Sequence, residues 1–277
     1  MRALQQIGLR HPRIQQVRRV ASGAHQDRRL LLAEGLWAHH VVVGLAAAIE
    51  VFLWCPEAAY SAEARALGAQ VAARARCSYR IGPAVLNRLC ERDRPDGLLS
   101  LVRLPAWDAD RIEFGADALV LVADAIELPG NLGTLLRTLD ACGGDCLVVT
   151  NRRTRLNHPM VFRGSRGMNL HVPVIEFAAP ADAARWLRDR GFTVVVATVS
   201  AGAVPYQQAR YGRRTAVVVG NERTGVTQPW LGRAGQAITI PMHGRADSLN
   251  VAVSASILMY DIRSRRGAFS GAARAAP

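Results

Sequence analysis

Short apolar runs, separated by polar and turn-forming residues, recur along the whole chain. The runs over 51–54 and 118–123 are apolar at every position, as expected for strands with both faces covered. We predict strands over 30–34, 51–54, 78–81, 98–102, 118–123, 146–150, 193–198, 215–219 and 236–240. Strands that alternate with helices predict an α/β protein, with a mostly parallel sheet and helices on both faces.

The predicted helices follow from a period near 3.6 residues and from their capping residues. Apolar residues recur on one face of a helix over 10–21. Ser61, followed by Glu63 in the first turn, is typical of a helix start and predicts a helix over 61–74. Further helices are predicted over 35–48, 132–141 and 248–263, with a short one after Pro83.

One break in this pattern divides the chain. It begins at Pro105 and indicates an N-terminal unit over 1–105, a linker over 106–116 and a second α/β unit over 117–264. The length of 277 residues suits one large or two ordinary domains. The small, basic stretch over 265–277 is predicted to be a disordered tail.

The net charge of the chain indicates the kind of partner that it binds. The chain has 35 basic and 22 acidic residues, which gives a formal net charge of +13, and half of its residues are hydrophobic. Every basic residue is Arg, so genomic composition can explain the choice of Arg over Lys but not the excess of bases. The excess indicates a polyanionic partner, and nucleic acid is favoured because guanidinium groups bind phosphate bidentately.

Several functional classes are not indicated by the sequence. The five cysteines are odd in number and lack the spacing of a disulfide framework or a zinc site, so we expect no metal. No Gly-x-Gly-x-x-Gly fingerprint and no phosphate-binding P-loop occurs. No apolar stretch reaches the roughly 18 residues of a membrane span, and the first 20 residues lack the core of a signal peptide. We therefore expect a cytoplasmic protein.

Three motifs in the second unit carry the candidate chemistry. The first is Asn131-x-Gly133-x-x-x-Arg137, in which positions 133 and 137 share one helix face. Gly133 permits close approach of a ligand or a backbone. Arg137 would direct a cation toward the strand ends, where α/β proteins bind ligands. Taken alone, the motif could equally be a helix cap followed by a surface arginine.

The second motif, Gly220-Asn221-Glu222, follows the apolar strand over 215–219. A glycine at a strand end indicates a tight turn or a close backbone approach. The Glu222 carboxylate could accept hydrogen bonds from a substrate or from Arg137. An ordinary turn before a helix would explain the same residues if this motif stood alone.

The third motif runs from Ile240 to Met242, crosses a polar loop and ends at Ser248-Leu249-Asn250. Ser248 is a candidate N-cap of the last helix, and Asn250 would then lie in the first turn, where Asn is a mediocre helix former. The small residues that follow indicate a helix that packs closely against another surface.

Together the motifs resemble those of the SpoU-TrmH RNA 2′-O-ribose methyltransferases of the SPOUT superfamily, and the resemblance covers essentially the whole chain. It implies a C-terminal SPOUT domain with a deep trefoil knot, preceded by a small ribosomal-protein-like α/β/α domain that binds RNA. It also implies S-adenosylmethionine as the cofactor. The loops implied to hold it contain Thr198, Val219, Gly220, Asn221, Ile240, Met242 and Leu249.

The resemblance implies a catalytic set of Asn131, Arg137, Glu222, Ser248 and Asn250. We expect Arg137 to orient the ribose 2′-oxygen and to stabilise its developing negative charge, because guanidinium is very hard to deprotonate. The proton acceptor stays open between a phosphate, water and Arg137 itself. Asn131 and Asn250 are expected to hold Arg137 and the ribose, Glu222 to tie the loops together, and Ser248 to orient the site.

The resemblance also implies a homodimer through the catalytic domain and an RNA partner, with 23S rRNA favoured over tRNA because of the appended N-terminal domain. Ser165-Arg166-Gly167 is similar to the actinobacterial antibiotic-resistance methyltransferases. Three alternatives stay open: a catalytically silent RNA-binding or ribosome-assembly protein on the same fold, a tRNA methyltransferase, and a nucleotide-dependent dehydrogenase or hydrolase. The candidate RNA contacts are Arg18, Arg19, Arg28, Arg29, Arg163 and Arg166.

Overall fold

The computed structural model describes residues 4–90, 95–233 and 235–267 and contains two compact units. The first unit comprises Met1–Ala106 and Arg155–His171, and the second comprises Trp107–Thr154 and Val172–Pro277. The first unit therefore takes in a segment that the sequence pattern placed inside the second. Phe162 and Leu170 explain this, because both are buried in a core cluster of the first unit.

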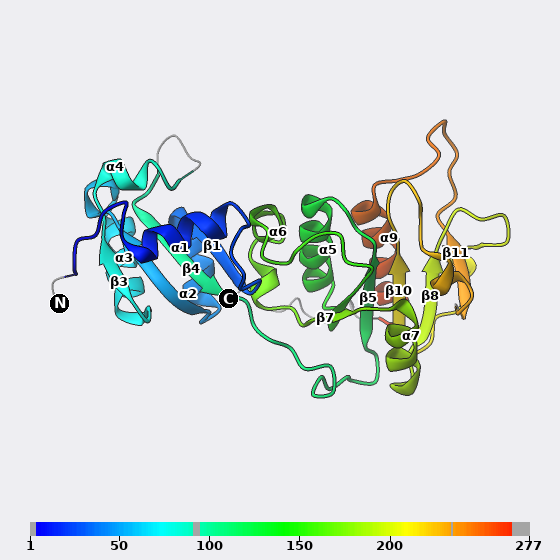
Figure 1. Ribbon diagram of the computed structural model, residues 1–277. Helices are drawn as coiled ribbons and strands as arrows, with labels where there is room; N and C mark the ends of the chain where they lie inside the picture. Colours follow the sequence, from blue (N-terminus) through cyan, green and yellow to red (C-terminus); the bar gives the residue numbers. More distant parts are fainter. Residues whose placement is uncertain (1–3, 91–94, 234, 268–277) are drawn as a thin grey trace. The chain divides into compact units, whose positions relative to one another are not determined.

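The first unit contains a four-stranded sheet in the order β1-β4-β2-β3 (Figure 1). Strand β3 is parallel to β2, and the other pairs are antiparallel. The strands are β1 (Leu30–Glu34), β2 (Ala48–Trp54), β3 (Ser78–Arg80) and β4 (Leu98–Arg103). The helices are α1 (Pro12–Ala21), α2 (Gly35–Gly44), α3 (Ala62–Arg74), α4 (Pro83–Leu86) and α6 (Pro159–Gly164), with 3-10 turns at Pro56–Ala58 and Met168–Leu170.

Both faces of this sheet are buried, because neighbouring residues of a strand point to opposite sides. Leu31 of β1 packs in one core cluster with Val42 of α2 and Leu67 of α3. Its neighbour Leu30 packs in a second cluster with Ile14 of α1. The first unit is therefore a sheet between two layers of helices.

The second unit contains a seven-stranded sheet in the order β7-β6-β5-β10-β8-β11-β9, and every pair in it is parallel. The sheet confirms the predicted α/β architecture. The strands are β5 (Leu119–Asp124), β6 (Cys146–Thr150), β7 (Val174–Phe177), β8 (Thr193–Ala197), β9 (Val204–Pro205), β10 (Thr215–Val219) and β11 (Gln236–Thr239). The helices are α5 (Pro129–Ala141), α7 (Pro180–Asp189), α8 (Gln228–Leu231) and α9 (Val251–Arg265), with a 3-10 turn at Tyr206–Gln208.

The strand order places the site. Helix α9 packs on α5 and β10, and α7 packs on β6, β7, β8 and α8. After β7 the chain crosses the sheet to build its other half, so a topological switch lies next to β5 and β10. Because all seven strands are parallel, their carboxyl ends share one edge, and open α/β sheets bind ligands at such a switch point.

Two helix starts differ from the sequence expectation. Helix α5 begins at Pro129 rather than at the predicted position 132, because proline suits the first helical position. Helix α9 begins at Val251 with Asn250 as its N-cap, so the prediction of Ser248 as the cap was wrong. The Asn250 side chain accepts a hydrogen bond from the backbone N–H two residues ahead, at 2.9 Å.

Two segment ends also differ. Helix α2 stops at Gly44 and β2 begins at Ala48, where we expected the helix to continue; Ala46, with φ of 50°, lies outside helical geometry. At the other end of the chain Arg265 belongs to α9 rather than to the tail predicted over 265–277. Residues 268–277 of that predicted tail lie outside the described residues. Among the described helices, none has the length and apolar character to cross a bilayer.

Candidate cofactor and catalytic site

A cavity of about 410 Å³ lies in the second unit at the carboxyl ends of β8, β10 and β11. Its lining comes from the segments that follow these three strands and from the start of α9. All of the residues predicted to hold the cofactor line it, namely Thr198, Val219, Gly220, Asn221, Ile240, Met242 and Leu249. The second and third motifs thus converge on one cavity. The sequence missed other lining residues, including Val226 and Ser254, which carry no motif signal.

The loop after β10 owes its shape to Gly220 and Asn221. A Cβ on Gly220 would lie 2.3 Å from the backbone of Gly225, so no larger residue fits. The Asn221 and Gly225 backbones exchange two hydrogen bonds, of 3.1 and 2.8 Å. The buried Asn221 side chain accepts from the Arg223 N–H at 2.8 Å and donates to the Ala125 carbonyl at 3.2 Å. Gly220 and Asn221 therefore fix the conformation of the loop that lines this side of the cavity.

Sequence reasoning missed Asp124, the last residue of β5. Its buried carboxylate accepts hydrogen bonds from the Thr150 hydroxyl and the Asn151 amide, both at 2.8 Å. It also accepts from the backbone N–H and the hydroxyl of Thr227, at 2.8 and 2.7 Å. Asp124 therefore joins the ends of β5 and β6 to the loop after β10. The one signal in the sequence is that Asp124, an acidic residue, directly follows the apolar run over 118–123.

Three of the predicted catalytic residues form one hydrogen-bonded group. The Asn250 amide donates to the Asn131 carbonyl oxygen at 3.1 Å, and the Asn131 amide donates to the Glu222 carboxylate. This group joins the starts of α5 and α9 to the loop after β10. Glu222 and Ser248 both line the cavity, and the Ser248 hydroxyl is bonded to the neighbouring Asp247 at 3.2 Å.

Arg137 lies apart from this group. It is exposed on α5, about 9 Å along the helix from Asn131 at 1.5 Å per residue, and it does not line the cavity. Within the described part of the chain, no hydrogen bond or ion pair engages its guanidinium. The two asparagines expected to hold Arg137 bond instead to each other and to Glu222.

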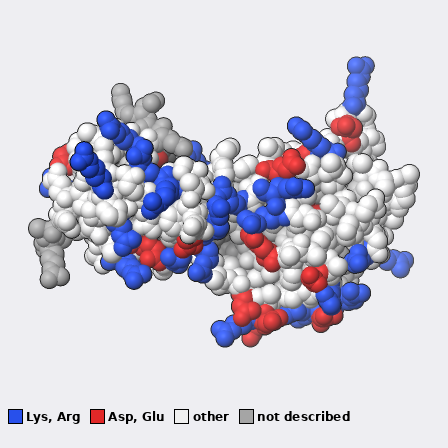
Figure 2. All heavy atoms as spheres, viewed as in Figure 1, with Lys and Arg blue, Asp and Glu red and all other residues white. Residues whose placement is uncertain are grey.

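The predicted RNA contacts all belong to the first unit. Arg18 and Arg19 are exposed in the last turn of α1, and Arg28 and Arg29 are exposed just before β1. Figure 2 shows basic side chains gathered on the visible face of this unit. Arg163 and Arg166 belong to the segment Arg155–His171. Arg163 lines a second cavity, and Arg166 lies 4.2 Å over the ring of Trp37. In the residues that the structure describes, no cluster of three or more His, Cys, Asp or Glu could hold a metal ion.

Comparison with known proteins gives the class of this site. Residues 118–260 match the SpoU rRNA Methylase family. Over 185 residues the chain is 31% identical to the Bacillus subtilis (strain 168) protein named 23S rRNA (guanosine(2553)-2′-O)-methyltransferase RlmP, covering 67% of this chain and 72% of that protein.

Two solved structures share the fold over nearly the whole chain. The AdoMet-bound rRNA methyltransferase of Sinorhizobium meliloti has a TM-score of 0.82 at 25% identity and covers 94% of this chain and 97% of its own. The SpoU methyltransferase AviRb of Streptomyces viridochromogenes, in complex with AdoMet, has a TM-score of 0.80 at 25% identity and covers 95% of this chain and 100% of its own.

The fold and the motif residues thus define an S-adenosylmethionine-dependent RNA 2′-O-methyltransferase. The chain belongs to the SpoU rRNA methylase family, as its motifs predicted.

The cavity suits this cofactor chemically. Its volume of about 410 Å³ is in the range of small-molecule sites. Ile240, Leu249 and Val226 supply apolar surface for a planar base, and the hydroxyls of Thr198 and Ser254 supply polar groups. The backbone of the loop after β10 adds further donors and acceptors. The residues present therefore fit a nucleoside-containing cofactor.

Proposed function

We propose that this protein transfers a methyl group to a ribose 2′-hydroxyl of large-subunit ribosomal RNA. The observation that carries the proposal is the cavity at the carboxyl edge of the sheet, to which Glu222 joins Asn131 and Asn250. The arginines of the first unit support an RNA partner, since basic side chains supply most of the affinity for a phosphate backbone. A relative named for 23S rRNA supports the choice of RNA.

S-adenosylmethionine, when bound, supplies a methyl group already activated by its sulfonium. The protein therefore has mainly to position the ribose and to allow removal of the proton of its 2′-hydroxyl. Arg137 orients the 2′-oxygen and stabilises its developing charge through guanidinium N–H groups. Asn131, Asn250 and Glu222 hold the starts of α5 and α9 against the cofactor loop, and Ser248 orients the site from the cavity wall.

The same proposal includes a homodimer through α5 and α9. These helices pack on each other, and the Ser256 hydroxyl donates to that of Thr138 at 3.3 Å. On α9, Val253 and Tyr260 are 48% and 41% exposed, and large apolar side chains at the surface favour association. Arg137 neighbours Thr138, so a second copy on this surface would enclose a catalytic candidate that does not line the cavity. We also propose that the segment between β11 and α9 threads a trefoil knot, as in the family.

Mapping of methylated riboses tests this function. Large ribosomal subunits, small subunits and tRNA are each incubated with the protein and radiolabelled S-adenosylmethionine, and the modified nucleotides are then located. We expect one 2′-O-methyl group in 23S rRNA, and the same map shows whether it lies at an antibiotic-binding position. Label in tRNA alone would contradict the target. Cofactor binding without transfer to any RNA would favour the silent RNA-binding alternative.

A further inference from the structure

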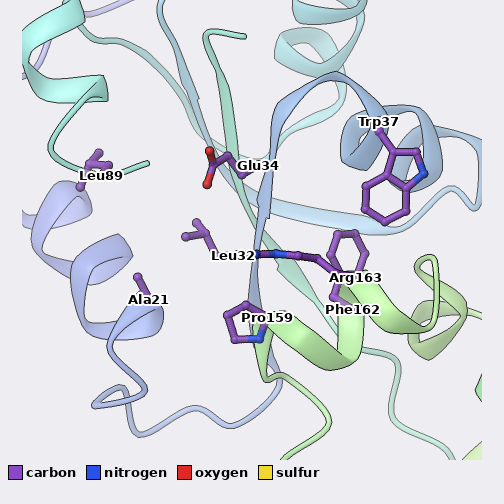
Figure 3. A pocket seen from close by; sticks show the side chains of 8 residues that line it. All are labelled: Ala21, Leu32, Glu34, Trp37, Leu89, Pro159, Phe162 and Arg163. Atoms are coloured by element: carbon purple, nitrogen blue, oxygen red, sulfur yellow. The ribbon is translucent and has the colours of Figure 1, made fainter. Parts of the chain in front are cut away.

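The loop that follows β10 lines the cofactor cavity with every residue from Gly220 to Val226. Val226 is the one hydrophobic residue among them, so apolar packing of its own side chains does little to fix this loop. The cavity of the first unit is built differently: Trp37 and Phe162 line it, and their ring centroids lie 5.4 Å apart (Figure 3). Hydrogen bonds must therefore hold the loop after β10 in shape.

Four hydrogen bonds end on Asp124, a buried carboxylate at the end of β5 that does not itself line the cavity. Its Oδ1 accepts from the Thr150 hydroxyl and the Asn151 amide, both at 2.8 Å. Its Oδ2 accepts from the backbone N–H and the hydroxyl of Thr227, at 2.8 and 2.7 Å. Within the described residues no arginine or histidine pairs with Asp124, so these donors offset the cost of burying its carboxylate.

The two hydroxyl groups beside Asp124 are committed to it. The Trp230 indole N–H donates to the Thr150 hydroxyl at 3.2 Å, and because an indole only donates, Thr150 directs its own proton to Asp124. Thr227 is the N-cap of α8, but its hydroxyl makes no capping bond to that helix and donates to Asp124 instead. The Thr227 side chain therefore serves the link to Asp124 and not the short helix.

The backbone beside Asp124 reaches the other end of the loop. Ala125, the next residue, has a φ of 54°, in the left-handed region that residues with a Cβ rarely adopt. Its N–H donates to the Thr150 carbonyl at 3.0 Å, and its carbonyl accepts from the buried Asn221 amide at 3.2 Å. Strained backbone persists where the surrounding structure holds it, and it clusters at functional sites. Asp124 and Ala125 thus hold the loop at both ends, at Thr227 and at Asn221.

We propose that Asp124 is a positioning residue, which fixes the loop after β10 before S-adenosylmethionine binds and so sets the affinity for the cofactor from outside the cavity. A loop that is ordered in advance loses less conformational freedom when its ligand arrives, so binding is tighter. The inference rests on the proposed function only in that the cavity takes this cofactor, and it holds whichever RNA is methylated. A residue that only stabilised the fold would change the unfolding midpoint and leave the affinity unchanged.

Asp124→Asn tests the proposal with almost no change in shape. The new amide has one acceptor oxygen and one NH2 group, so one of the two pairs of donors loses its acceptor. We expect the Kd for S-adenosylmethionine, measured by calorimetric titration, to rise about tenfold, the usual scale for one buried donor left unpaired. The KM for the cofactor should rise by a similar factor. The kcat should stay within about threefold, because saturating cofactor restores the loop.

Hydrogen exchange of the cofactor-free protein measures the loop directly. In the wild type the backbone N–H groups of Asn221, Gly225 and Thr227 are all hydrogen-bonded and should exchange slowly. In Asp124→Asn we expect the amides over 220–227 to exchange about tenfold faster, because the loop opens more often. The amides of α7 should keep their rates, which separates a local effect from a general loss of stability.

Variants at Thr227 and Asp145 are the controls. Thr227→Val keeps only the backbone donor to Asp124 and should weaken cofactor binding about threefold, whereas Thr227→Ser keeps both donors and should retain most of that affinity. Asp145 accepts from the N–H of Leu119 at 2.7 Å, at the start of the same strand β5. Asp145→Asn should lower the unfolding midpoint and leave the cofactor affinity unchanged. If Asp124→Asn does not fold, the comparison of the two Thr227 variants decides.

Wild-type cofactor affinity in Asp124→Asn, or unchanged exchange over 220–227, would overturn the proposal. An equal loss of affinity in Asp145→Asn, or equal affinities of the two Thr227 variants, would overturn it as well. The mapping of methyl groups judges the proposed reaction separately. A protein that methylates rRNA while Asp124→Asn binds the cofactor normally loses the positioning role alone. A protein that methylates no RNA, but whose Asp124→Asn variant binds the cofactor weakly, loses the proposed reaction alone.

Discussion

The guanidinium of Arg137 is exposed and outside the cavity, so its contribution should appear in the rate and not in cofactor binding. We expect Arg137→Ala to lower methyl transfer by about a hundredfold to a thousandfold, the usual effect of removing a stabiliser of developing charge. Arg137→Lys should recover little, because an ammonium lacks the planar fork. Radiolabel transfer and calorimetric titration of S-adenosylmethionine measure the two effects. Unchanged turnover in Arg137→Ala would remove it from the mechanism.

A single added methyl group tests the cavity wall. In Gly220→Ala the new Cβ would lie 2.3 Å from the backbone of Gly225, so the loop after β10 must move. We expect the affinity for S-adenosylmethionine to fall at least tenfold, because that loop lines the cavity. Gly244→Ala is the matched control, since a Cβ there meets nothing within 4 Å. Calorimetric titration with S-adenosylmethionine measures the affinity of both variants. Equal affinities would show that the loop after β10 tolerates the added methyl group.

Burial also produces a pH dependence, at His39. The side chain is fully buried between the Gly35 carbonyl and the Ser100 hydroxyl, both at 2.8 Å, and burial lowers its pKa to about 4. The unfolded chain takes up a proton near pH 6.5 and the folded chain does not, so His39 stabilises less as the pH falls from 6.5 to 4. The total loss is about 3 kcal/mol at 1.36 kcal/mol per pKa unit. Urea denaturation between pH 4 and 7 should show a steeper decline for the wild type than for His39→Leu, and parallel curves would contradict it.

For single residues, the sequence identified those that belong to a short motif. It missed residues whose partners lie far away along the chain. The residues that we propose to hold the cofactor belong to short motifs, and all of them line one cavity. Asp124 has no partner near it in sequence, because the groups that it accepts from lie 26, 27 and 103 positions further along the chain. The Asn250 cap was missed for a similar reason, since Ser248 is the equally good N-cap candidate that comes first.

Helix α9 shows how one element is fixed at both of its ends. Its start bonds to Asn131, and its last turn carries arginines that donate to backbone carbonyls. Arg266, which caps the helix, donates to the carbonyls of Asp117 and Gly212 at 2.9 and 2.8 Å and to the Thr215 hydroxyl at 2.7 Å. Helix α9 therefore begins beside the cavity, and its last turn is held at the amino-terminal edge of the sheet, on the opposite side.

This arrangement predicts an unequal effect of two arginine deletions. Arg266→Ala removes a partly buried guanidinium that donates to the Asp117 and Gly212 carbonyls and to the Thr215 hydroxyl, and we expect a loss of about 2–3 kcal/mol in the free energy of unfolding. Arg213→Ala is the control: it ion-pairs with Asp117 at 3.1 Å, but its side chain is 77% exposed, so its loss should hardly change the melting temperature. Guanidinium denaturation of both variants gives the comparison. Equal midpoints would show that the last turn of α9 contributes little.

Among the elements, the apolar strands were the most predictable. A buried parallel strand is apolar at nearly every position, and β5, β6 and β10 each have a single polar residue, at one end, so the sequence pattern identified them directly. Helix α6 was not predicted. Its assignment to the first unit depends on Phe162 packing in the core of that unit, and this contact is distant in sequence. Strand β9 has two residues and no pattern at all. Local periodicity fixes an element's type, but distant contacts decide where a short element belongs.

At the scale of the whole molecule, the surface of α9 predicts the oligomeric state. Val253 and Tyr260 are large apolar residues exposed on the helix that packs on α5, so a second copy should cover them. We expect the protein to sediment as a dimer at micromolar concentration. Val253→Asp should shift it to monomer, because the aspartate would have to be buried without a partner. Ala84→Asp, on α4 of the first unit, is the control for added charge and should stay dimeric.

The same pair of variants separates assembly from cofactor binding. Residues of this chain at the ends of β8, β10 and β11 line the cavity, so we expect a Val253→Asp monomer to keep binding S-adenosylmethionine. Methyl transfer should fall with the dimer fraction, because Arg137 lies beside the proposed dimer surface and outside the cavity of its own chain. Sedimentation velocity and transfer assays over a concentration series measure both quantities. A wild-type monomer at micromolar concentration, or a fully active Val253→Asp monomer, would contradict a dimeric active site.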